Sequence, residues 1–324
     1  MYCESLAGGR RQALKGHIPV LLDEVVESMG ALRGRAFLDL TFGGGGHAQA
    51  ILERVPGSTV LAFDQDPAAQ ARAAQLQETF SERLRFEARN FEEMGMIQDT
   101  GFTGVLMDLG VSSFQLDEVS RGFSVRDDAP MDMRMNSSQG QTAAEFLETA
   151  SLEAIETALR DYGEESRWRA VARAIVEARG TGVLARTASF AELVEQHAAR
   201  SAPGRRRIHP ATRTFQGIRI AVNRELECLE KALPLAFEKL APGGALLVIS
   251  FHSLEDRIVK RYFKRLAGRP EHRYDDRSQD QREAVAELVT RKPITPGEDE
   301  IRANPRARSA KLRVVRKHAG GAEN

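Results

Sequence analysis

The chain has 324 residues, 42% of them hydrophobic, and its 46 basic side chains balance its 46 acidic ones. This length suits one large domain or two ordinary ones, and the hydrophobic share is sufficient for a packed core. The two cysteines, Cys3 and Cys228, cannot build a disulfide framework or a cysteine-rich metal site. We therefore expect a cytoplasmic protein with neither a membrane span nor a secretory signal.

Residues 36–47, Ala-Phe-Leu-Asp-Leu-Thr-Phe-Gly-Gly-Gly-Gly-His, join a short apolar run to four consecutive glycines. The apolar run predicts a buried strand, and Ala48, Ala50, Ile51 and Leu52 then open a helical pattern. Glycine allows a sharp turn and a close approach to a ligand, and a helix N-terminus offers free N–H groups. The segment predicts a βα unit that binds a nucleotide.

The next apolar run, Thr59–Phe63, ends at Asp64, where an acid can bind both hydroxyls of a ribose. Gly43, Gly45 and Ala48 also fit the spacing of a dinucleotide-binding fingerprint. These two features leave two cofactors open, NAD and S-adenosylmethionine.

Helices and strands alternate along much of the remaining chain. A short helix is expected to end near Gly30, and later helices at 67–80, 143–147, 152–162, 166–179, 190–199, 218–240 and 254–266. Further strands are expected at 83–88, 102–108, 245–250, 287–292 and 310–316. The alternation predicts an α/β fold with a mostly parallel, doubly wound sheet, and the strand-free stretch after 117 predicts an inserted helical domain.

The expected domains follow from this order. Residues 1–16 form a loose tail, 17–114 and 215–317 the α/β domain, 115–214 the helical insert that recognises the substrate, and 318–324 a C-terminal tail. In open parallel sheets the site lies at the carboxyl ends of the strands. We expect Gly43–His47, Asp64, Asn90–Phe91, Asp108 and Ser250–His252 to meet there.

Two basic runs stand out in a chain that is neutral overall. One, Arg302–Lys317, holds seven basic residues and no acid, and the other is Arg205–Arg207. Such patches bind phosphates or are simply solvated surfaces. In the last strand Lys311 and Arg313 share a face, and they contact either phosphates or the acids Glu298, Asp299 and Glu300.

Eight motifs resemble one known family. They are His17–Glu24, Asp39–His47, Asp108–Asp117, Arg121–Ser124, Pro130–Met135, Ile208–Gln216, Arg219–Asn223 and Ser250–Arg257. In order, and from about His17 to Lys317, they are similar to the RsmH family, also called MraW, of bacterial small-subunit ribosomal RNA cytosine-N4 methyltransferases. One departure is Phe114, where many members have proline.

The resemblance implies a class I, Rossmann-like methyltransferase fold with S-adenosylmethionine as methyl donor. It implies 16S ribosomal RNA, within the small subunit, as partner and N4 of a cytidine, nucleotide 1402 in the usual numbering, as target. The implied cofactor contacts are Gly45, Gly46, His47, Asp64, Phe91, Asp108 and Gln115. Whether the protein forms a homodimer stays open.

The acceptor for the cytosine amine is not fixed by a motif, because Asp108-Leu-Gly-Val replaces the Pro-Pro turn of many amino methyltransferases. Candidate catalytic residues are Asp108, Asp132 and His252, and candidate RNA contacts are Arg134, Arg213, Arg219, Ser250, Lys311 and Arg313. No metal is expected. The rival interpretations are a methyltransferase for another RNA, a protein or a small molecule, an NAD-dependent dehydrogenase, and a non-catalytic RNA-binding scaffold.

Overall fold

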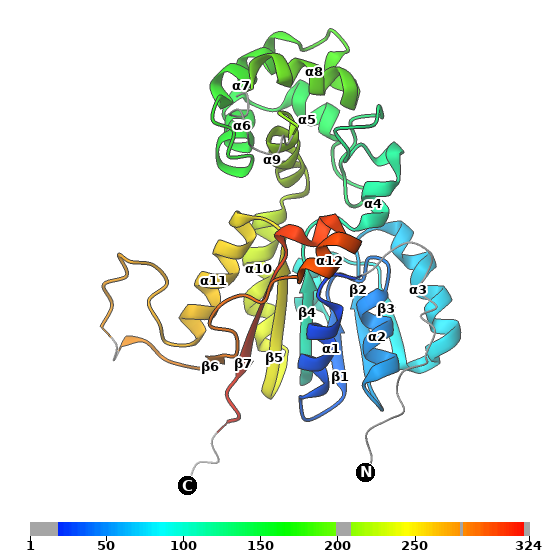
Figure 1. The fold of residues 1–324 in the computed structure, drawn as a ribbon, viewed down its shortest axis with the longest axis vertical. Helices are drawn as coiled ribbons and strands as arrows, with labels where there is room; N and C mark the ends of the chain where they lie inside the picture. The colour runs from blue at the N-terminus through cyan, green and yellow to red at the C-terminus, as the bar shows by residue number, and fades with distance from the viewer. Residues whose placement is uncertain (1–18, 199–208, 279–280, 321–324) are drawn as a thin grey trace.

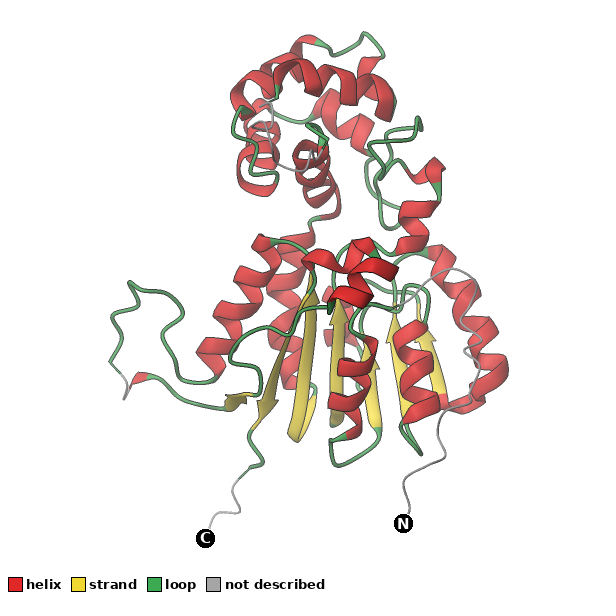
Figure 2. Cartoon of the chain, viewed as in Figure 1, coloured by secondary structure: helices red, strands yellow, loops and turns green. Residues whose placement is uncertain are grey.

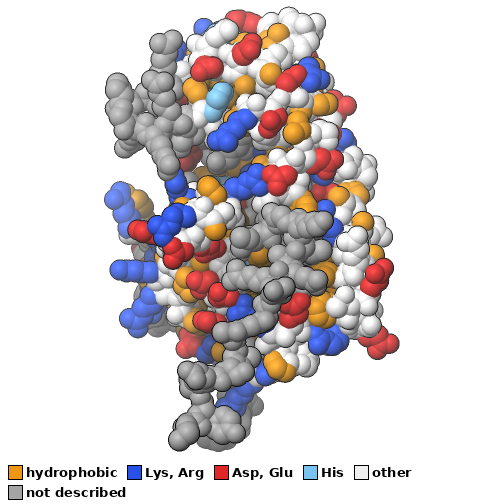
Figure 3. All heavy atoms as spheres, turned by 45° about the vertical axis from the view of Figure 1, so that its right-hand side comes forward, with side chains coloured by type: hydrophobic (Ala, Val, Ile, Leu, Met, Phe, Trp, Pro, Cys, Tyr) orange, Lys and Arg blue, Asp and Glu red, His pale blue; other side chains and the backbone are white. Residues whose placement is uncertain are grey.

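The computed structural model describes residues 19–198, 209–278 and 281–320. The expected N-terminal tail and the basic run Arg205–Arg207 lie outside these residues. Within them, no helix is both long enough and apolar enough to cross a bilayer. Basic and acidic side chains are interspersed over the face that Figure 3 shows, as the balanced composition leads one to expect.

A seven-stranded sheet forms the centre of the α/β domain, with the strand order β3-β2-β1-β4-β5-β7-β6. Its strands are β1 (Ala36–Asp39), β2 (Thr59–Phe63), β3 (Leu84–Glu87), β4 (Phe102–Asp108), β5 (Leu240–Ser250), β6 (Ala286–Leu288) and β7 (Lys311–Lys317). The pairs among β1 to β5 are parallel, and β7 is antiparallel to both β5 and β6. The antiparallel β7 between β5 and β6 distinguishes this sheet from the 3-2-1-4-5-6 order of dinucleotide-binding folds.

Helices cover both faces of the sheet (Figure 2). Neighbouring strand residues point to opposite faces, and here both faces are apolar and must be covered. Phe37 belongs to the core under α1 (Leu22–Gly30), α2 (Gly46–Arg54) and α3 (Pro67–Phe80). Leu38 belongs to the core under α10 (Glu225–Glu238) and α11 (Ser253–Leu266). The strands are therefore apolar on both faces, which explains the unbroken apolar runs in the sequence.

A third core belongs to the helical insert, which Figure 1 shows above the carboxyl ends of the strands. The helices after β4 are α4 (Ser113–Asp117), α5 (Ala143–Thr149), α6 (Leu152–Thr157), α7 (Trp168–Glu177), α8 (Thr187–His197) and α9 (Thr212–Asn223). Phe215 and Ile218 of α9 are buried in this third core together with Phe190. We therefore propose that the insert extends through α9 to Arg224, beyond the boundary expected at 214.

The remaining elements are short. They are α12 (Glu298–Ala303), the 3-10 turns η1 (Ser81–Arg83), η2 (Phe91–Met96), η3 (Val119–Arg121), η5 (Val183–Ala185) and η7 (Pro305–Ser309), and the π-helical turn η4 (Ala158–Tyr162). Figure 1 shows α12 lying across the top of the sheet, beneath the insert. This position brings the C-terminal segment next to the strand ends.

Two expected elements were wrong in extent, and a third has the expected extent but changes its helix type. The helix expected at 218–240 is two helices, because Arg224 has a left-handed backbone with φ 52°. The helix expected at 152–162 changes to π-helix at Ala158, where Gly217 of α9 packs so closely that a side chain would overlap the Ala158 carbonyl oxygen. The strand expected at 287–292 is regular only over Ala286–Leu288, after which the N–H groups of Val289 and Thr290 both donate to the Val314 carbonyl oxygen.

Candidate active site

A cavity of about 330 Å³ lies at the carboxyl ends of β1, β2 and β4. This volume is at the lower end of the range for small-molecule sites, ~300–1,000 Å³. Of the expected cofactor contacts, Gly46, His47, Asp64, Phe91, Asp108 and Gln115 line it. Pro19, Val20, Asn304 and Arg306, which the sequence did not single out for the cofactor, line it as well.

The glycine turn between β1 and α2 forms one wall of this cavity. Gly45 has a left-handed backbone, φ 78°, and a Cβ there would lie 2.5 Å from Leu76 and 2.6 Å from Phe42. A side chain at Gly44 would overlap the ring of Phe114. Gly45 is not itself among the lining residues, and its left-handed backbone makes the bend.

Asp64 is held in place by two backbone N–H groups. Gly43 donates to its Oδ2 at 2.6 Å and Asp66 donates to its Oδ1 at 2.8 Å. Burial raises the pKa of Asp64 to about 6, against the opposing effect of these hydrogen bonds. Each oxygen keeps a free lone pair for a ligand hydroxyl, so the carboxylate is prepared to receive a ribose diol.

Asp108 and His47 lie side by side at the end of β4. Nε2 of His47 lies 3.0 Å from the carbonyl oxygen of Val20 and therefore carries a proton, while Nδ1 lies 3.6 Å from Oδ2 of Asp108. Burial first, then the charges of Asp39 and Glu255, raise the pKa of Asp108 well above its ordinary value. Its Oδ1 is buried and has no hydrogen-bond partner among the described residues. That oxygen is an acceptor suited to a ligand amine.

Gln115 closes the cavity from the side of the insert. Its Nε2 donates to Oδ2 of Asp66 at 2.9 Å, and Nη1 of Arg121 lies 3.1 Å from the same oxygen. Arg121 also donates to the carbonyl oxygens of Arg134 and Met135. This buried network joins the start of α3 to the insert. The sequence did not predict it, although Asp66-Pro67 is a recognisable helix start.

Four expected site residues lie away from the cavity. Asp132 binds Arg134 through two hydrogen bonds of 2.9 and 2.8 Å. Arg213 is exposed and donates to the Glu164 carbonyl oxygen. Ser250 is buried at the end of β5. None of these four expected residues is among the residues that line the cavity.

Lys311 and Arg313 both pair with Asp256, at 3.0 and 2.7 Å. Within the described residues the acid beside them is thus Asp256 rather than Glu298, Asp299 or Glu300. The side chain of Arg313 is only 10% exposed. Its burial argues against the phosphate contact expected from the sequence.

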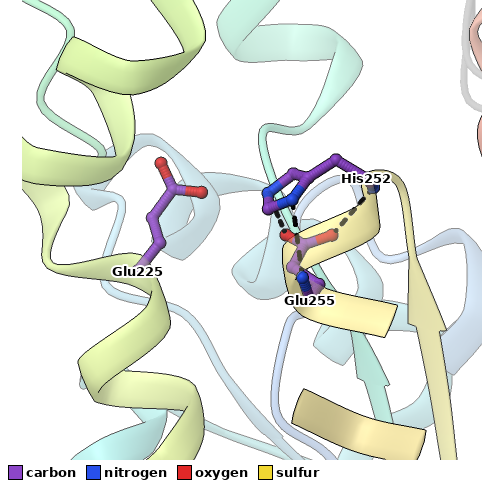
Figure 4. Close-up of side chains that lie close together, drawn as sticks. All are labelled: Glu225, His252 and Glu255. Carbon is purple, nitrogen blue, oxygen red and sulfur yellow. Dashed lines mark hydrogen bonds and ion pairs between the residues drawn. The ribbon is translucent and has the colours of Figure 1, made fainter. Parts of the chain in front are cut away.

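His252 belongs to a cluster with Glu225 and Glu255, whose ligand-type atoms all lie within 4.8 Å of one another (Figure 4). Arg219 donates to both oxygens of Glu225 at 2.8 Å, and the backbone of Phe251 donates to Glu255 at 2.8 Å. The carboxylates of this cluster are therefore already balanced by a guanidinium and a helix N-terminus. We interpret the cluster as a support that fixes Arg219, which lines the cavity.

The strand order, the glycine turn and the acids at the strand ends together define a class I methyltransferase. This confirms the fold class expected from the sequence. Only the glycine spacing had kept NAD open. The antiparallel β7 is not part of the sheet of dinucleotide-binding folds, and it therefore argues against a dehydrogenase.

The chain belongs to the MraW methylase family, whose model matches residues 15–318. It is 45% identical to ribosomal RNA small subunit methyltransferase H of Heliobacterium modesticaldum, over 93% of this chain and 98% of that protein. It is 48% identical to the enzyme of the same name from Methylobacterium nodulans, over 92% and 89%. An rRNA methylase structure from Streptococcus thermophilus shares 10% identity over 92% and 93%, with a TM-score of 0.40, a distance at which the likeness carries no argument.

Proposed function

We propose that this protein transfers a methyl group from S-adenosylmethionine to N4 of a cytidine in 16S ribosomal RNA, nucleotide 1402 in the usual numbering. The names of its relatives support the small-subunit RNA as substrate. The observation that carries the choice of an amine acceptor is Oδ1 of Asp108, which is buried in the cavity and has no hydrogen-bond partner within the described part of the chain. A cytoplasmic location, where the small subunit is found, agrees with this substrate.

The cavity has the features that S-adenosylmethionine requires. Asp64 would bind the ribose hydroxyls, Phe91 would cover the adenine, and the glycine turn would leave room for the methionine portion. When bound, this cofactor supplies a methyl group on a sulfonium, which is an excellent leaving group. The protein must then mainly align the acceptor nitrogen with that methyl group.

Asp108 is the best candidate for the residue that engages the cytosine amine, since of Asp108, Asp132 and His252 it alone lines the cavity. The amine lone pair is delocalised into the ring, and a hydrogen bond from the amine to Asp108 favours the geometry in which it localises. Binding that geometry more tightly than the ground state accelerates transfer. The nitrogen then gains the methyl group and releases one proton, for which the Asp108 carboxylate is the nearest acceptor in this proposal.

The experiment that tests the proposal maps methylated nucleotides in 16S ribosomal RNA from cells with and without the gene. We expect one cytidine to lose its N4-methyl group in the absence of the gene and to regain it when the gene is restored. An unchanged methylation pattern would refute the proposal and favour another RNA, a protein or a small molecule as substrate.

A further inference from the structure

A groove of about 1330 Å³ adjoins the cofactor cavity, with roughly four times its volume. It is bounded by the insert loop around Phe123, by α9, and by the C-terminal segment Ile301–Arg308. The two hollows share lining residues, among them Leu116, Arg219 and Arg306. A molecule lying in the groove can therefore place one of its groups in the cavity.

The charged side chains that line the groove are all basic. Among the described residues, its lining includes five arginines, Arg126, Arg219, Arg302, Arg306 and Arg308, and neither aspartate nor glutamate. This contrasts with the balanced charge of the whole chain. Such a concave, one-signed surface concentrates a polyanion.

Two of these arginines, Arg126 and Arg308, are exposed, and their guanidinium groups have no hydrogen-bond or ion-pair partner among the described residues. The backbone N–H of Arg126 donates to Ser124 Oγ. Arg302 and Arg306 pair with the exposed acids Asp299 and Asp117, contacts that solvent weakens. Arg219 is held by Glu225 as described above. A ligand in the groove can therefore pair with Arg126 and Arg308 directly, and with Arg302 and Arg306 in place of their exposed acids.

The basic run Arg302–Lys317 divides at this groove. Its first part, with Arg302, Arg306 and Arg308, lines the groove. Its second part is engaged inside the protein: Arg313 pairs with Asp256, and Lys317 donates to the Leu240 carbonyl oxygen. The first part is therefore the one that faces the groove.

We propose that this groove holds the single-stranded RNA that flanks the target cytidine, with Arg126 and Arg308 as phosphate contacts. This proposal rests on the function proposed above. A groove much larger than the cofactor cavity fits several nucleotides, and its position lets one base enter the cavity edge-on. Single-stranded RNA is the form whose bases can be turned out in this way.

The test compares wild-type protein with the double variant Arg126→Gln, Arg308→Gln. RNA binding is measured by filter binding of a 16S ribosomal RNA fragment at several salt concentrations, and S-adenosylmethionine binding by calorimetry. Each lost phosphate contact on single-stranded RNA should reduce the slope of log affinity against log salt by ~0.7, so the double variant should lose ~1.4. Its KM for RNA should rise, and its cofactor affinity should equal that of the wild type.

The matched control is Arg33→Gln, Arg291→Gln, which removes two exposed arginines that line neither hollow. It should keep the wild-type slope, KM and activity. If the wild type methylates the RNA and the groove variant keeps its salt slope and KM, the groove is not the RNA path.

If the proposed function itself is wrong, the same experiments give a different result. In that case the wild type itself leaves 16S ribosomal RNA unmethylated and binds it no better than the groove variant does. Binding of polyglutamate by the wild type, lost in the groove variant, would then overturn the RNA proposal in favour of an acidic protein partner.

Discussion

At the scale of single residues, Asp64 predicts how cofactor binding depends on pH. Its pKa is raised to about 6, chiefly by burial, and only the ionised carboxylate can accept from both ribose hydroxyls. Lowering the pH through 6 protonates the group and removes that acceptor. We expect S-adenosylmethionine affinity to be constant above about pH 7 and to be roughly tenfold weaker at pH 5, since it follows the ionised fraction.

Calorimetry of the wild type and of Asp64→Asn across this pH range checks the prediction. The variant should bind the cofactor weakly at pH 8. Its affinity should change much less between pH 7 and pH 5 than that of the wild type. Asp161→Asn, at a half-exposed carboxylate paired with Arg160, serves as the control and should titrate like the wild type. A variant with the full wild-type pH dependence would assign the titration to another group, such as Asp108.

At the scale of an element, the turn from β1 to α2 predicts two costs for Gly45→Ala. The backbone there is left-handed, and the new Cβ would meet Leu76 and Phe42. Gly57 provides a matched control, because it is also left-handed, φ 73°, but has nothing within 4 Å of a Cβ. Gly57→Ala should lower the free energy of unfolding by about 1–2 kcal/mol, which is the backbone cost alone.

Gly45→Ala should lower it by about 1–3 kcal/mol more, because the extra atom overpacks a filled core. Urea denaturation of the two variants measures this difference, and a thermal shift with S-adenosylmethionine shows whether the bend matters to the cavity. Equal losses in the two variants would mean that the residues around Gly45 relax freely, contrary to the packing described here.

At the scale of the whole molecule, the separate core of the insert predicts that its stability can be lowered without losing the cofactor site. Phe190 is fully buried in that core. Phe190→Ala should cost about 3–5 kcal/mol of insert stability. Because Gly46, His47 and Asp64 lie in the other domain, we expect methyl transfer to fall much further than cofactor affinity.

Single-turnover methylation and calorimetry on the same preparation separate the two effects. Leu152→Ala, at a half-exposed position of the insert, should change neither quantity. A parallel loss of cofactor affinity and activity in Phe190→Ala would show that the insert and the α/β domain fold as one cooperative unit.

Local patterns in the sequence determined most of the strands of the sheet, the start of α3 and several candidate site residues. Apolar runs such as Phe102–Asp108 predict strands because a buried parallel strand is apolar on both faces, and that strand has the expected bounds. Pro67 fixes the start of α3 for a similarly local reason, its restricted backbone. The glycine turn, Asp64 and Asp108 could be predicted as site residues, because the ends of parallel strands meet at one edge whatever else the chain does.

Other features depend on pairs that are distant in sequence, and only the tertiary structure decided them. Whether Arg313 is free or paired depends on Asp256, 57 positions away, and the closure of the cavity depends on Arg121 meeting Asp66. The division of the C-terminal basic run has the same origin, since α12 and η7 reach the cavity while β7 enters the sheet. The sequence shows that a side chain is basic, but whether it can bind a ligand depends on which acid the fold places beside it.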